Sequence, residues 1–161
     1  MLRFDTRPQS LERLKIFECA YEEVLQEEDG ALVLLGISGH NMILWDDQTL
    51  VAHTVGIAVS RMPCGEPDED CKPWADASFN TKVLYMYATT VRGEFQGKGY
   101  GKLLCAYYAG FKKAQGFQTL IGHATSPSMK AIREWMGADF RAKHSNWCGS
   151  ERTAEFYVQP I

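Results

Sequence analysis

The spacing of apolar residues predicts helices in three parts of the chain. In residues 11–25 the apolar side chains recur at steps of three and four, which is the period of one helix face. Ser10 can cap the start of this helix, and an Asp-Gly pair can end it. The stretches Gly101–Gln115 and Ser128–Met136 have the same period, and each is followed by a glycine at a natural C-cap position.

Shorter apolar runs between these helices predict strands. They are Met42–Trp45, Leu50–Ser60, Val83–Val91, Thr119–Thr125, Phe140–Ser145 and Thr153–Gln159. Ala31–Ser38 is so uniformly apolar that a buried strand and a short helix both stay open. Residues 62–80 carry Pro, Gly and five acidic residues, which is typical of a long surface loop. The order of elements predicts one α/β (α+β) domain over residues 1–161.

Composition and charge narrow the class of protein. The chain has 161 residues, of which 45% are hydrophobic and 23% charged, and this balance excludes intrinsic disorder. The net charge of −3 hides an asymmetry, since residues 1–79 carry −9 and residues 80–161 carry +6. With a sequence pI of 5.8, a nucleic-acid partner is not expected. No signal-peptide or membrane-spanning pattern is visible, which favours a cytoplasmic protein without a membrane partner.

The cysteines indicate neither a disulfide framework nor a metal site. They are five in number and include no C-x-x-C pair, so free thiols in a reducing compartment are expected. Cys64 and Cys71 flank the acidic loop, but no nearby His or Cys completes a set of metal ligands. We therefore predict no metal.

The junction between residues 91 and 102, VRGEFQGKGYGK, carries the most specific chemistry. A buried strand ends, a glycine-rich turn follows, and an amphipathic helix begins. The first amides of a helix lack intrahelical partners and attract anions, and glycine lets the backbone approach a phosphate closely. The turn is not a Walker A loop, because Gly97-Lys98 is followed by Gly99 instead of Ser or Thr. It is not a dinucleotide fingerprint either, because Lys102 and Leu104 stand where the third Gly of that motif would be. We predict a phosphate-binding loop.

The same junction satisfies the pattern Q/R-x-x-G-x-G/A through Gln96, Gly99 and Gly101. It resembles the acyl-CoA loop of the GNAT superfamily of N-acetyltransferases, and the resemblance covers residues 83–140. It implies a single-domain GNAT-like fold, with a mixed, mostly antiparallel sheet whose splayed central strands are flanked by helices. It also implies that loop amides hold the CoA pyrophosphate and that the preceding strand pairs with the pantetheine arm. The cofactor-binding residues expected on this basis are Thr89, Thr90, Val91, Gln96, Gly97, Lys98, Gly99, Tyr100, Gly101, Lys102 and Ser126.

The implied reaction is direct transfer of an acyl group from acetyl-CoA to a primary amine in a ternary complex. Several GNAT members carry a catalytic Glu where this chain has Tyr85, and many have a Tyr on the helix that here spans residues 128–136 and has none. His123 is the best candidate base, because imidazole titrates near neutral pH, and Tyr85 and Tyr87 are candidate acids. A core histidine and aromatic packing are the alternative interpretations of these three residues.

The acceptor is less legible in the sequence. The acidic residues of the 62–80 loop and of residues 27–29 could attract a cationic amine, or could merely be solvated. Two functions stay open: an N-acetyltransferase, and a non-catalytic CoA-binding regulator or antagonist on the same fold. A homodimer is compatible with either function.

Overall fold

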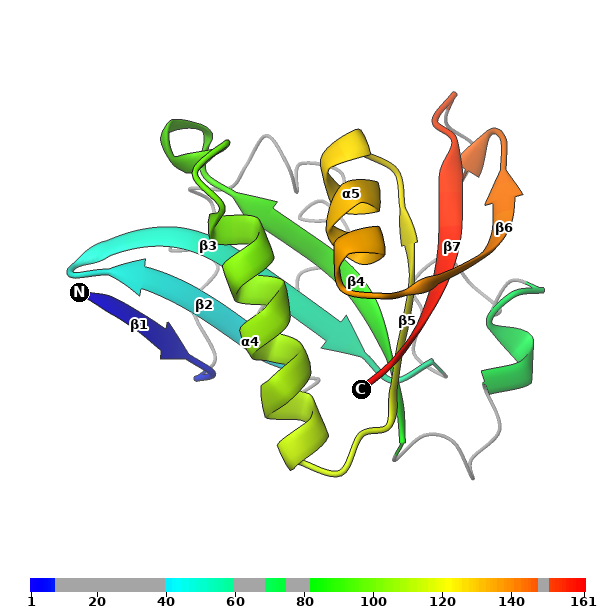
Figure 1. Ribbon diagram of the computed structural model, residues 1–161, viewed down its shortest axis with the longest axis horizontal. Coiled ribbons are helices and arrows are strands. Elements are labelled where there is room, and N and C mark those ends of the chain that lie inside the picture. The colour runs from blue at the N-terminus through cyan, green and yellow to red at the C-terminus, as the bar shows by residue number, and fades with distance from the viewer. Residues whose placement is uncertain (8–39, 60–68, 75–81, 148–150) are drawn as a thin grey trace, which may run out of the picture. The chain divides into compact units, whose positions relative to one another are not determined.

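The computed structural model describes residues 1–7, 40–59, 69–74, 82–147 and 151–161 (Figure 1). The predicted helix after Ser10, the segment Ala31–Ser38 and most of the 62–80 loop lie outside these ranges. The strands are β1 (Leu2–Asp5), β2 (Asn41–Asp46), β3 (Thr49–Ile57), β4 (Val83–Val91), β5 (Thr119–Ala124), β6 (Asp139–His144) and β7 (Ala154–Pro160). The helices are α4 (Tyr100–Ala114) and α5 (Pro127–Trp135), with short 3-10 turns η3 (Lys72–Trp74) and η4 (Gly93–Phe95).

The described strands form one mixed sheet in the order β1-β2-β3-β4-β5-β7-β6. β4 and β5 run parallel, and β1–β2, β2–β3, β5–β7 and β6–β7 are antiparallel pairs. The register of β4 on β5 covers Val83–Tyr85 against Thr119–Ile121, although both strands continue further along the chain. This mostly antiparallel α+β architecture confirms the predicted fold class.

The chain divides into two compact units, and β4 and α4 each contribute to both. The first unit comprises residues 1–57 and 88–108, and the second comprises residues 58–87 and 109–161. The core of the first unit is built on β2 and β3, whose consecutive buried residues show that both faces are covered. The hydroxyl of buried Tyr108 donates to the backbone oxygen of His40 at 2.8 Å, which ties α4 into this unit.

The sequence pattern does not predict β1. Four residues are too few to establish a period of two, and this strand is recruited by backbone pairing with β2. The terminal amine adds an ion pair with Asp47 at 2.5 Å. At the other boundary, the sequence predicts a strand to Ser60, whereas β3 ends at Ile57.

In the second unit, all of β5 pairs with residues 155–160 of β7, and the central segments of both strands are buried. α5 begins as expected, because the hydroxyl oxygen of Ser126 accepts a hydrogen bond from the amide of Met129 at 3.2 Å. Gly116 and Gly137 have φ angles of +96° and +75° just after α4 and α5, which confirms both as C-cap glycines. No helix in the described ranges is long and apolar enough to cross a membrane.

A buried lysine near the end of α4 was not apparent from the helical pattern. Lys112 is 1% exposed, and its ammonium donates to the side-chain oxygen of Gln115 at 3.0 Å. It also lies over the rings of Phe111 and Phe117. Burial lowers the pKa of Lys112 to about 8, because the charged form loses hydration.

Candidate functional site

The glycine-rich turn of the first unit has the geometry of a phosphate-binding loop. Gly97 and Gly99 have φ angles of +75° and +84°, in the left-handed region where a side chain is strained. A Cβ built on either residue would meet no atom within 4 Å, so the space above the backbone is open. The oxygen of Gly99 accepts from the amide of Leu103 at 3.0 Å, which starts α4 directly after the turn.

This loop is anchored to the strands on which it stands. The backbone amide of Arg92 donates to the backbone oxygen of Val51 at 3.0 Å. The guanidinium of Arg92 donates to the backbone oxygen of Leu50, also at 3.0 Å. Arg92 also pairs with Glu94 at 2.5 Å. The side-chain amide of Gln96 donates to the oxygen of Val91 at 3.0 Å, so this residue of the loop motif stabilises the turn. The loop is therefore held in place before any ligand binds.

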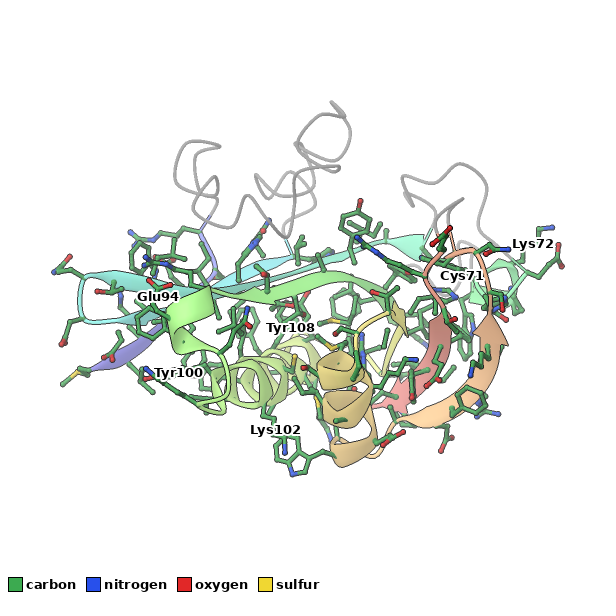
Figure 2. The ribbon with its side chains drawn as sticks, turned by 90° about the horizontal axis from the view of Figure 1, so that it is seen from above. Cys71, Lys72, Glu94, Tyr100, Lys102 and Tyr108 are labelled. Carbon is green, nitrogen blue, oxygen red and sulfur yellow. The ribbon has the colours of Figure 1, made fainter. Side chains whose placement is uncertain are left out.

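Basic and aromatic side chains lie around the same turn. The ring of Phe95 has the ammonium of Lys98 5.4 Å from its centroid, and it meets Tyr100 edge to face at 5.9 Å. Lys98 and Lys102 are exposed. Figure 2 labels Glu94 beside the loop and Tyr100 and Lys102 at the beginning of α4. Two lysines and the free amides of a helix start can together bind a polyanion.

The predicted residues at the end of β4 use their side chains in different ways. Thr89 shares a hydrogen bond with the hydroxyl of Thr54 at 2.7 Å, and Thr54 also bonds the oxygen of Ala88 at 3.1 Å. Thr90 and Val91 are half-buried.

In the second unit, the hydroxyl of Ser126 caps α5 and is already engaged there. Ser126 could therefore reach a ligand only with its remaining hydrogen-bonding capacity.

A second group of polar side chains lies within the second unit. The hydroxyl of Tyr85 in β4 is 2.9 Å from Nδ1 of His123 in β5. Nε2 of His123 is 3.3 Å from Oδ2 of Asp70, and Nε2 of His144 in β6 bonds the same carboxylate oxygen. Asp70 stands in the turn that precedes η3, where Figure 2 labels Cys71 and Lys72.

The hydrogen bonds indicate which tautomer a neutral His123 adopts. A carboxylate only accepts, so Nε2 of His123 donates to Asp70, and Nδ1 then accepts from the hydroxyl of Tyr85. Aromatic rings enclose the imidazole: Trp147 stacks on it at 3.9 Å, and Phe156 lies at 4.8 Å. Its side chain is 1% exposed. A buried imidazole that accepts a hydrogen bond at one ring nitrogen and donates one at the other can relay a proton between its two partners.

Sequence reasoning identified two members of this group and missed the other two. Tyr85 and His123 were predicted as catalytic candidates, and the structure joins them by a hydrogen bond. Tyr87 is half-buried in β4. Asp70 was visible only as one of several acids in a loop, and His144 only as a strand residue. In the sequence, Asp70 is 53 positions from His123 and 74 positions from His144, so no local spacing identifies these residues as a set.

Comparisons with known proteins identify the family. Residues 11–138 match the acetyltransferase (GNAT) family. Among solved structures, the chain is similar to a polyamine N-acetyltransferase from Drosophila melanogaster, with 14% identity, TM-score 0.71 and 100% coverage of both chains. It is also similar to an agmatine N-acetyltransferase, with 11% identity, TM-score 0.66 and 99% coverage of both chains. No curated protein matches the sequence.

A third similar structure is a GNAT acetyltransferase from Elizabethkingia anophelis with acetyl-CoA bound. Its identity is 12% and its TM-score 0.68, with 99% of this chain and 98% of that chain covered. At such identities these structures establish the fold, and the match over residues 11–138 establishes the family. The glycine loop between β4 and α4 stands where the resemblance of the sequence requires it. The chain belongs to the acetyltransferase (GNAT) family.

Proposed function

We propose that this protein is an acetyl-CoA-dependent N-acetyltransferase that transfers its acyl group directly to a primary amine. The observation that carries the proposal is the turn at Gly97 and Gly99. Both glycines are in the left-handed region, and open space lies where a Cβ would be. A loop of this kind, directly before a helix N-terminus, fits a pyrophosphate. Acetyl-CoA would supply an acetyl group activated as a thioester.

Different residues of the chain would bind different parts of acetyl-CoA. The amides of the turn and of the first residues of α4 would hold the pyrophosphate, helped by Lys98 and Lys102. The backbone of Thr89–Val91 would pair with the pantetheine arm, while the Thr89 hydroxyl stays bonded to Thr54. Gln96 would keep the turn in its binding conformation by its bond to the oxygen of Val91. Gly101 and Tyr100 would complete the start of the helix.

Tyr85, His123 and Asp70 would carry out the proton transfers that the reaction requires. Acyl transfer to an amine requires that the acceptor nitrogen lose a proton and that the leaving thiolate can gain one. The Tyr85 hydroxyl donates to Nδ1 of His123, and Nε2 donates to Asp70. If Tyr85 loses its proton to His123, the imidazolium that forms is stabilised by the carboxylate beside it. The phenolate of Tyr85 would take the proton of the acceptor amine, in the place of the catalytic Glu of other members, and Tyr87 would be the acid that protonates the leaving thiolate.

We propose that the acceptor is a cationic amine. Two of the similar structures are of proteins named as a polyamine N-acetyltransferase and an agmatine N-acetyltransferase, and such acceptors are cationic amines. Within the described ranges, Glu69 pairs with Lys72 at 2.5 Å, and Asp70 bonds two histidines. Most of the charge of these two acids is therefore already engaged. The other acids of the loop lie outside the described residues.

The decisive experiment is an assay of free thiol released from acetyl-CoA over a panel of amines. The panel contains agmatine, spermidine, an alanine-initiated peptide, a lysine peptide and a neutral primary amine. We expect turnover with at least one amine and higher kcat/KM for the cationic ones. CoA affinity is measured in parallel by calorimetry. Tight CoA binding with no turnover on any amine would instead establish the non-catalytic regulator.

Two further properties stay predictions from the sequence. We expect a cytoplasmic protein, and the two described cysteines, Cys71 and Cys105, are buried. A homodimer is compatible with this, and sedimentation of the purified chain tests it.

A further inference from the structure

Three potential metal ligands converge in the second unit. One ring nitrogen each of His123 and His144 and a carboxylate oxygen of Asp70 all lie within 4.8 Å of one another, and both Nε2 atoms contact Oδ2 of Asp70. They come from β5, β6 and the turn before η3, so three separate segments aim a donor atom at one point. We call these three residues the Asp-His-His cluster. Among the described residues, this is the group that meets the geometric conditions for holding a metal ion.

The donor set matches the chemistry of a divalent transition ion. Imidazole nitrogens and a carboxylate oxygen are ligands of zinc, which binds them at about 2.0–2.2 Å. Two such ligands at a tetrahedral centre lie about 3.3 Å apart. The separation of His123 Nε2 and Asp70 Oδ2 is 3.3 Å, so this pair needs little movement. Three protein ligands leave a fourth position open to water or another small ligand.

The surroundings of the cluster support a metal site. Metal-bound histidines usually bond a second residue through the other ring nitrogen, which fixes the ring. The Tyr85 hydroxyl holds Nδ1 of His123 in this way, at 2.9 Å. The ring is also stacked on Trp147. The side chains of His123, Asp70 and His144 are 1%, 16% and 34% exposed, so His123 is buried and the other two ligands are partly exposed.

We propose that the Asp-His-His cluster binds a zinc-type divalent ion. Binding would displace the two Nε2 protons that now point at Asp70, and each neutral imidazole would take up a proton on Nδ1 in exchange, so no net proton is released. The charge of the ion would then compensate the carboxylate in place of those donors. The tautomer of His123 would also change, because a ring whose Nε2 binds metal carries its proton on Nδ1.

One consequence rests on the proposed function. With Nδ1 protonated, His123 donates to the Tyr85 oxygen and can no longer accept its proton. The ion and the proton path through Tyr85 are therefore mutually exclusive. Zinc should inhibit acetyl transfer reversibly, and a chelator should restore it.

The primary test measures binding without acetyl-CoA or amine. Zinc is titrated into the full chain in competition with a chromophoric chelator at fixed pH, and cobalt is used as a spectroscopic substitute. Asp70→Asn and His144→Gln are compared with Asp139→Asn, in which an exposed carboxylate paired with Arg141 is removed from the same unit. Thermal melts of each variant show whether it is folded.

We expect one ion per chain and the visible absorption of tetrahedral cobalt. His144→Gln and Asp70→Asn should each weaken binding by about 100-fold or more, since even outer partners are worth about 10- to 100-fold. Asp139→Asn should bind like the parent chain. Folded variants that bind as tightly as the parent, or thiolate-to-cobalt bands that assign the ion to cysteines, would overturn the proposal. Lack of acetyl transfer with any amine would leave this binding result unaffected and would count against the proposed function alone.

Discussion

The hydroxyl of Tyr85 lies 2.9 Å from Nδ1 of His123, a residue 38 positions further along the chain. β4 and β5 are parallel and in register at Tyr85 and Ile121, so the histidine comes two residues after the paired position. This single contact unites the two residues that sequence reasoning had selected for independent reasons. It converts a phenol and an imidazole into one hydrogen-bonded unit with Asp70 at its far end.

Replacing Tyr85 by Phe tests the role of this hydroxyl. The variant removes the donor to His123 but keeps the ring, so the fold should be retained. If Tyr85 manages a proton in the reaction, kcat should fall by about 100-fold or more, with unchanged affinity for CoA. The measurement is steady-state kinetics with the best amine, together with calorimetric titration of CoA.

Tyr157→Phe is the matched control for that variant. Tyr157 is buried in the same unit, and its hydroxyl bonds Glu155 at 2.9 Å. Burial, followed by this hydrogen bond, raises the pKa of Tyr157 well above its usual range. Loss of this hydroxyl should leave kcat within about twofold. Equal losses of kcat in both variants would mean that Tyr85 acts through packing.

Gly99→Ala tests the conformation of the turn that we propose binds CoA. Gly99 has φ of +84°, where a Cβ costs about 1–2 kcal/mol, and the strain should displace the turn that receives the pyrophosphate. We expect CoA to bind about tenfold more weakly. Gly93→Ala is the control, because Gly93 is not among the positive-φ glycines and its Cβ would meet no atom within 4 Å. Equal CoA affinity in the two variants would refute the loop assignment.

Gly122 in β5 should tolerate no side chain. A Cβ there would lie 2.9 Å from Nη2 of Arg133 and 3.0 Å from the backbone oxygen of Met86. Because a strand backbone cannot retreat easily, Gly122→Ala should lower the free energy of unfolding by about 1–3 kcal/mol. Gly110→Ala, on the exposed face of α4, has no such contact and should raise it by about 0.5–1 kcal/mol. Urea unfolding of both variants measures the difference, and a stabilised Gly122→Ala would contradict the packing.

His53 should make the fold sensitive to acid. It is fully buried in β3 with Nε2 2.5 Å from the side-chain oxygen of Asn41, and burial lowers its pKa from 6.5 to about 3. Below pH 6.5 the unfolded chain binds a proton that the native state excludes, so stability falls as the pH falls. The loss is about 1.4 kcal/mol per pH unit, or roughly 2 kcal/mol at pH 5.

His53→Gln tests this pH dependence, because glutamine can still donate to Asn41 but does not titrate. The free energy of unfolding is measured at pH 7 and pH 5 for both proteins. The variant should lose roughly 2 kcal/mol less than the parent between these values. An identical loss in both proteins would show that other groups cause the acid sensitivity.

The elements that the sequence predicts well are those with a strong local pattern. α4 and α5 begin within one residue of the predicted positions, and Val83–Val91 is a strand over its whole predicted length. These segments combine clear periodicity with local end signals such as Gly116 and Gly137. β1 escaped prediction because its stability comes from pairing with β2, a partner 40 residues away that leaves no mark on four residues.

The sequence by itself determined the glycine-rich turn between β4 and α4. Strand, glycine turn and helix are consecutive there, so every requirement of the loop is written within a dozen neighbouring residues. Only the tertiary structure decided which side chains accompany His123. Asp70, Tyr85 and His144 reach it from separate segments, because sheet pairing and burial bring distant residues together. A one-dimensional pattern records periodicity and local chemistry, but the meeting of donors across strands depends on register, which the whole fold sets.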